Sequence, residues 1–183
     1  MKHTNFPLFI DSTDKKVIVY GCGLIATRRI KTLLKFKFQI DVIGRTPTME
    51  FEKLLYEPEN SEQIKFCRKP IDASDISKIN KETFLVVAAT SSREINNKIA
   101  ERAKECNVFH SIADSKDECD VFFPAVRTKD EVVIGIAGDG SNHKKTRKIA
   151  DDIGALLENN LNCKSDKLYL KLTAQLNLRG DLK

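Results

Sequence analysis

Hydrophobic and polar residues alternate in blocks along the first 114 residues, and each block has the length and spacing of a strand or a helix. Short apolar runs rich in β-branched residues predict buried strands. Apolar positions three or four residues apart, with charged residues between them, predict amphipathic helices. The predicted strands are 17–20, 38–44, 64–68, 83–90 and 108–114. Helices are expected after the first, second and fourth strands, the last of them capped by Ser91 or Ser92, and residues 71–80 are poorly defined.

This alternation predicts an α/β fold, a Rossmann-like, doubly wound parallel sheet covered by helices. After Asp114 the rhythm changes. Apolar runs at 121–126 and 132–137 flank a polar turn and predict an antiparallel hairpin, followed by helices at 143–158 and 166–178. We therefore expect a nucleotide-binding domain at 1–114, and a hairpin plus helical region for dimerisation and substrate binding at 115–183.

Composition narrows the class of protein. Hydrophobic residues make up 41% and charged residues 31% of the chain, which is typical of soluble globular proteins, and no apolar window is long enough to cross a bilayer. The first ten residues lack the pattern of a secretion signal, and the five cysteines are scattered without a C-x-x-C pair. We expect a cytoplasmic protein with reduced thiols. The basic cluster at 143–148 has no interleaved aromatic residues, so no nucleic-acid partner is expected.

A glycine turn, Gly21-x-Gly23-x-x-Ala26, joins the first strand to the first helix. In dinucleotide-binding units the first glycine makes the tight turn, the second lets the backbone approach a pyrophosphate, and a small third residue lets the helix pack on the strand. The pyrophosphate would bind at the helix N-terminus, near Leu24 and Ile25, where free N–H groups favour negative charge. This turn predicts a dinucleotide site.

The end of the second strand should discriminate between NAD and NADP. An acidic residue there holds the ribose hydroxyls of NAD, but this chain has Gly44-Arg45-Thr46. Arg45 would either receive the 2′-phosphate of NADP or stack beside the adenine while Thr46 contacts the ribose. NAD and NADP both stay open on these residues.

Three segments together resemble the precorrin-2 dehydrogenase family, which includes the N-terminal dehydrogenase/ferrochelatase module of siroheme synthases. The segments are 7–34, 86–100 and 109–153. Their most specific parts are Pro7-Leu8-Phe9, the strand end Ala88-Ala89-Thr90 with Asn96 after it, and Asp114 followed by Phe122-Phe123-Pro124.

The resemblance implies NAD-dependent oxidation of precorrin-2 to sirohydrochlorin in siroheme or cobalamin biosynthesis. It also implies a homodimer and, in some members, insertion of Fe²⁺ or Co²⁺ as a substrate metal. In the family, an aspartate at the position of Asp114 is implicated in both activities, so Asp114 is also the candidate metal-binding residue. We expect Ala89 and Thr90 to complete the cofactor site.

Asp114 is the candidate catalytic residue on physical grounds as well. It ends a predicted parallel strand, at the edge where doubly wound sheets bind ligands. Its carboxylate would accept a proton as hydride leaves the macrocycle, or deprotonate pyrrole nitrogens in a chelatase reaction. The alternative is that Asp114 caps the turn in Asp114–Glu118.

The substrate carries many carboxylates, so its site needs cations and hydrogen-bond donors. The candidates are Arg127, Ser141, Lys144 and Lys145.

Two other functions stay open: a chelatase with little dehydrogenase activity, and a non-catalytic NAD-sensing domain, which would not need Asp114. His110 is expected in the core, Cys22 as a space filler beside the cofactor, and one of Phe122 and Phe123 facing the core.

Overall fold

The computed structural model describes residues 5–138 and 142–160. They form two compact units. The larger unit is Leu8–Phe123, and the smaller combines the N-terminal residues up to Pro7 with the chain from Pro124 onward. The assignment of 1–114 and 115–183 to separate functional regions stays a prediction.

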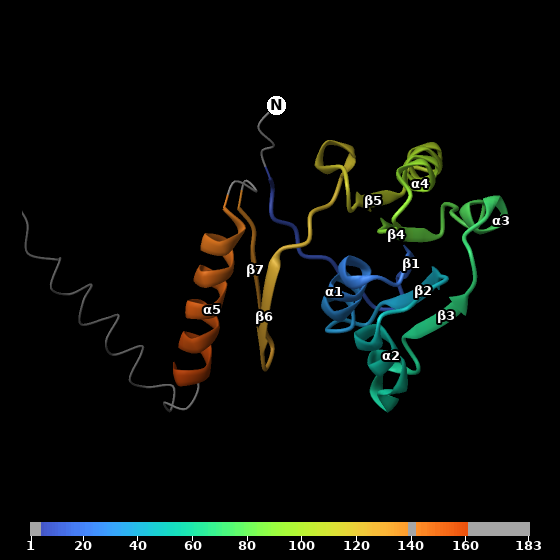
Figure 1. Ribbon diagram of the computed structural model, residues 1–183. Helices are drawn as coiled ribbons and strands as arrows, with labels where there is room; N and C mark the ends of the chain where they lie inside the picture. Colours follow the sequence, from blue (N-terminus) through green and yellow to red (C-terminus); the bar gives the residue numbers. More distant parts are fainter. Residues whose placement is uncertain (1–4, 139–141, 161–183) are drawn as a thin grey trace, which may run out of the picture. The chain divides into compact units, whose positions relative to one another are not determined.

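The larger unit is built on a five-stranded sheet with the strand order β3-β2-β1-β4-β5 (Figure 1). All neighbouring strands in it are parallel. The strands are β1 (Lys16–Tyr20), β2 (Gln39–Gly44), β3 (Ile64–Arg68), β4 (Thr83–Ala88) and β5 (Phe109–Ile112). The chain winds outward from β1 in one direction and then from β4 in the other, so the carboxyl ends of β1 and β4 mark the switch point where such sheets bind ligands. The predicted Rossmann-like sheet is confirmed.

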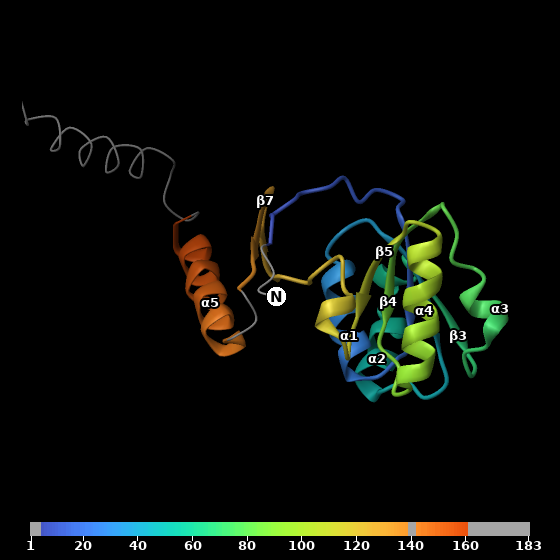
Figure 2. The ribbon, with the colours of Figure 1, turned by 90° about the horizontal axis from the view of Figure 1, so that it is seen from above.

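Helices cover both faces of this sheet. They are α1 (Leu24–Leu33), α2 (Met49–Tyr56), α3 (Ala73–Ile76) and α4 (Arg93–Glu105), with the 3₁₀ turns η1 (Pro58–Asn60) and η2 (Lys116–Glu118). Side chains of a strand alternate between the two faces, so each face has its own hydrophobic core. Ile30 of α1 and Phe51 of α2 pack in one core, and Ile99 and Ala103 of α4 pack in the other. Figure 2 shows α1 and α2 on one side of the sheet and α4 on the other.

The stretch that the sequence left undefined contains α3, a single helical turn too short to show hydrophobic periodicity. A capping box between Asp72 and Asp75 starts it. The Asp75 carboxylate has no exposed surface and pairs with Lys69 and Lys78, at 2.9 Å each. These polar contacts hold the turn together with Ile76, which packs against the same core as Ile99 of α4.

The smaller unit contains an antiparallel hairpin, β6 (Ala125–Lys129) and β7 (Val132–Ile136), followed by α5 (His143–Asn160). The predicted start of the first hairpin strand, at residue 121, is wrong. Phe123 instead packs against a core of the larger unit, and Pro124 has no N–H to donate to a ladder. The predicted helix at 166–178 lies outside the described residues. Among the helices of the described residues, none is long and apolar enough to cross a membrane.

Candidate functional site

Gly21 fixes the turn between β1 and α1. Its φ is +112°, and a Cβ at this position would lie 2.3 Å from the carbonyl oxygen of Ala89. The Gly21 N–H donates to Ile43 O (2.8 Å), and the Ala89 N–H donates to Tyr20 O (2.8 Å). The turn is thus tied to the ends of β2 and β4, and only glycine fits there.

The space around Gly23 is open, whereas the space around Gly21 is filled by Ala89 and Thr90. Gly23 is the N-cap of α1, and a Cβ there would meet nothing within 4 Å. No side chain caps this helix and no acidic residue lies in its first turn. Leu24 and Ile25 are 59% and 50% exposed. An open, uncapped helix N-terminus beside a glycine fits a dinucleotide pyrophosphate. The contacts predicted for Gly21, Gly23, Leu24 and Ile25 stay predictions, and this geometry supports them.

Cys22 fills the space between the turn and the end of β2. It is 3% exposed, and a Cβ at Gly44 would lie 2.6 Å from its Sγ. Burial raises the pKa of the Cys22 thiol. Arg45 and Thr46 follow at the surface. Cys22 is the buried space filler that the sequence predicts.

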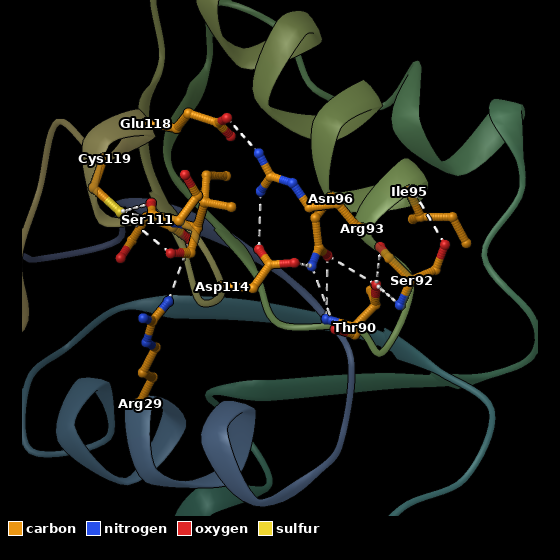
Figure 3. A network of polar contacts seen from close by, with 12 residues as sticks. Arg29, Thr90, Ser92, Arg93, Ile95, Asn96, Ser111, Asp114, Glu118 and Cys119 are labelled. Carbon is orange, nitrogen blue, oxygen red and sulfur yellow. Dashed lines mark hydrogen bonds and ion pairs between the residues drawn. The ribbon is translucent and has the colours of Figure 1, made fainter.

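Asp114 follows β5 by two residues and is held by two side chains of α4 (Figure 3). Asn96 Nδ2 donates to Oδ2 over 3.0 Å, and Arg93 Nη1 donates to Oδ1 over 3.1 Å. The Asp114 side chain is 38% exposed. The carboxylate is therefore fixed in orientation and still reachable from solvent. Both of its oxygens contact side chains of α4.

Asn96 connects the end of β4 to Asp114. It is fully buried, and its Oδ1 accepts from both the N–H (3.2 Å) and the hydroxyl (2.8 Å) of Thr90. Its Nδ2 lies 3.3 Å from Thr90 O in addition to its bond to Asp114. Ser92 caps α4 by accepting from the Ile95 N–H. Thr90, Asn96 and Asp114 therefore form one polar network at the carboxyl edge of the sheet.

The sequence did not single out Arg93 and Glu118. Besides Asp114, Arg93 binds Glu118 of η2. The hydrogen bonds to these two carboxylates raise the pKa of Arg93, and the bond to Glu118 has the largest effect. Arg93 could have been found, because it lies three residues before Asn96 and such pairs share a helix face. No pattern pointed to Glu118.

Arg29 links α1 to the end of β5. Its Nη1 donates to Ser111 O over 3.3 Å, and its guanidinium lies 5.3 Å from the ring centroid of Phe123. Burial lowers the pKa of Arg29. Phe123 packs against the core, as predicted for one of the two rings, and the Phe122 ring lies 5.9 Å from Lys116 Nζ. His110 is 2% exposed, as expected of a core histidine.

The predicted substrate residues belong to the smaller unit. Arg127 on β6 pairs with Asp151 of α5, and its Nη1 donates to Val126 O over 2.8 Å. Lys144 and Lys145 are exposed in the first turn of α5, and Ser141 lies outside the described residues. All four stay predictions. Among the described residues, no group of three or more His, Cys, Asp or Glu side chains could hold a metal ion.

The parallel sheet, the Gly21 turn and the open N-terminus of α1 define a dinucleotide-binding domain. The chain belongs to the family described as "Putative NAD(P)-binding", whose model matches residues 8–125.

Relatives confirm the resemblance found in the sequence. The chain is 40% identical over 149 residues to a "Probable multifunctional siroheme biosynthesis protein" of Ruminiclostridium josui, covering 81% of this chain and 27% of the relative. It is 24% identical to the "Precorrin-2 dehydrogenase" of Bacillus subtilis (strain 168), covering 89% of this chain and 95% of the relative. The solved structure of "SirC, precorrin-2 dehydrogenase" shares the fold, with a TM-score of 0.63 and 24% identity over 82% of this chain and 70% of that one. The chain spans less than a third of the multifunctional relative and of several siroheme synthases.

Proposed function

We propose that the chain oxidises precorrin-2 to sirohydrochlorin, with a nicotinamide dinucleotide as hydride acceptor, in siroheme or cobalamin biosynthesis. The observation that carries the proposal is the Asp114 carboxylate, oriented by Asn96 and Arg93 at the ligand-binding edge of a dinucleotide-binding sheet. The names of the relatives support the choice of substrate.

The reaction removes one hydride and one proton from precorrin-2. The bound dinucleotide supplies the acceptor for the hydride. The N–H groups at the start of α1 would hold its pyrophosphate, and Ala89 and Thr90 would lie beside it at the end of β4. Asp114 takes the proton, because its carboxylate is both exposed and fixed in orientation. Asn96 and Arg93 are positioning residues, since each holds one of its oxygens.

Metal insertion is the second candidate activity. In that reaction Asp114 would guide Fe²⁺ or Co²⁺, as substrates, toward sirohydrochlorin. The Arg93 guanidinium lies 3.1 Å from Asp114 Oδ1 and opposes a second cation at the same oxygen. We therefore propose dehydrogenation as the main activity.

The homodimer stays part of the proposal. Arg127 and Lys129 face α5, as their ion pairs with Asp151 and Glu158 show. Val133 pairs with Thr128, so it lies on the opposite face of the hairpin, and it is 38% exposed. α5 already covers the inner face of this two-stranded ribbon, and a second copy covering the outer face would bury Val133. A tetrapyrrole substrate bound by Arg127, Ser141, Lys144 and Lys145, and a cytoplasmic location, complete the proposal.

The test is an anaerobic reaction of the purified chain with enzymatically generated precorrin-2 and either NAD⁺ or NADP⁺. Absorbance measures both products, with the reduced dinucleotide followed at about 340 nm. The molar amounts of sirohydrochlorin and of reduced dinucleotide should rise equally, because each turnover transfers one hydride. Metal-dependent conversion of sirohydrochlorin without precorrin-2 oxidation would favour the chelatase. Dinucleotide binding with neither reaction would favour a sensor domain.

A further inference from the structure

The end of β2 is the position at which this fold distinguishes the two nicotinamide dinucleotides. An acidic side chain there accepts hydrogen bonds from the ribose hydroxyls of NAD, whereas an arginine nearby accommodates the 2′-phosphate of NADP. In this chain Gly44 ends β2. A Cβ at Gly44 would lie 2.6 Å from Cys22 Sγ, 3.1 Å from Cys22 N and 3.2 Å from Cys22 Cβ. The packing of Cys22 thus excludes an acidic side chain from this position.

The nearest carboxylates on α2 do not replace the missing acid. Glu50 and Glu52 both lie in the first turn of this helix. Glu50 pairs with Lys31 of α1, and Glu52 pairs with Arg68 at 2.7 Å. Both are engaged by cations, so neither is a free acceptor for ribose hydroxyls.

Two arginines stand at the same edge. Arg45 directly follows β2 and is exposed, and no hydrogen bond or ion pair within the described residues involves its side chain. Arg68 ends β3 in register with Gly44, but its guanidinium is already paired with Glu52 at 2.7 Å. A guanidinium that is free to make paired hydrogen bonds suits a phosphate dianion.

We propose that this chain binds NADP(H) more tightly than NAD(H), with Arg45 holding the 2′-phosphate. The inference rests on the proposed dinucleotide site and specifies which dinucleotide that site prefers. It does not depend on the tetrapyrrole reaction.

The test uses fragments that isolate the adenosine end of the cofactor. Adenosine 2′,5′-bisphosphate and 5′-AMP are titrated into the full chain by isothermal calorimetry in a phosphate-free buffer. We expect the bisphosphate to bind roughly tenfold more tightly or better, because only it offers the second phosphate to Arg45. Arg45→Ala should remove this difference while leaving 5′-AMP binding unchanged, whereas Arg68→Ala should retain it, because Glu52 already engages Arg68. The matched control is Arg28→Ala, an exposed arginine of α1.

The possible results separate the NADP preference, the role of Arg45 and the existence of the cofactor site. Equal binding of the two fragments, or tighter binding of 5′-AMP, overturns the NADP inference and leaves the dehydrogenase proposal standing. A preference that survives in Arg45→Ala overturns the assignment of this arginine. Absence of binding by either fragment, and by both full dinucleotides, removes the cofactor site and with it the proposed function.

Discussion

Asn96 Nδ2 lies 3.0 Å from Asp114 Oδ2, and the Asn96 side chain that makes this bond is fully buried. Replacing Asn96 with alanine leaves the carboxylate held only by Arg93. We expect kcat for precorrin-2 oxidation to fall by roughly tenfold or more, because the orientation of the base is lost. The KM for the dinucleotide should rise as well, because Thr90, a predicted cofactor residue, loses its two bonds to Asn96. Loss of the buried hydrogen bonds should also lower the free energy of unfolding by about 1–3 kcal/mol.

The neighbouring Asn97 is a matched control, because it is exposed on the same helix. Asn97→Ala should leave both kcat and stability unchanged. If Asn96→Ala lost stability but kept the wild-type kcat at a temperature where it is folded, Asn96 would be structural only.

The two glycines of the turn predict opposite effects of one substitution. Gly21→Ala meets Ala89 O and a positive φ, so the free energy of unfolding should fall by about 2 kcal/mol or more. Gly23→Ala meets no atom, so the protein should keep its fold and lose dinucleotide affinity, since the methyl group occupies the space of the pyrophosphate. Chemical denaturation and calorimetric titration of both variants measure the two effects. Undiminished dinucleotide binding by Gly23→Ala would place the pyrophosphate elsewhere.

The sheet was predictable because its strands are continuous apolar runs separated by amphipathic helices, and the 64–68 strand was predicted with its observed bounds. The turn was predictable because Gly21 and Gly23 stand at fixed spacing after a strand. The contacts of Asp114 were not, since Asn96 and Arg93 lie 18 and 21 residues before it in the chain and meet it only in the folded structure. Phe123 misled the hairpin prediction because an apolar residue can equally pack against the preceding core.

The buried Asp75 carboxylate makes stability depend on pH. Burial alone would raise its pKa, but hydrogen bonds from Lys78, Lys69 and the Asp72 backbone lower the pKa by more, and it ends below its ordinary value. The contribution to stability is therefore fully present above about pH 4, the pKa range of an unfolded aspartate, and is lost as the pH falls through the lower folded value.

Asp75→Asn tests this dependence. At pH 7 the free energy of unfolding should fall by about 3 kcal/mol, at the lower end for a buried pair because both lysines are partly exposed. Urea denaturation at decreasing pH should show the difference from wild type shrinking below about pH 4. The exposed Asp152→Asn serves as control. A difference that stayed constant into acid would show that the charge of Asp75 does not stabilise the fold.

The outer face of the hairpin predicts the effect of a charge at Val133. A lysine there should convert the proposed homodimer to a monomer, because a charge in the apolar centre of an interface is costly to desolvate. Size-exclusion chromatography with light scattering measures the mass. Glu131→Lys, in the hairpin loop, should leave the mass of the wild type unchanged. A wild-type monomer, or a Val133→Lys dimer, would contradict dimerisation through the outer face of the hairpin.

The central claim is that Asp114 takes the proton released when precorrin-2 is oxidised, and single-turnover kinetics of Asp114→Asn test it most directly. The amide keeps the size of the carboxylate but has one acceptor oxygen, so it can accept from only one of Asn96 and Arg93. The glycine turn is unchanged, so the variant should bind the dinucleotide as wild type does. Its rate of sirohydrochlorin formation should fall by roughly a hundredfold or more, the scale of a lost general base. Wild-type turnover by Asp114→Asn would contradict the account.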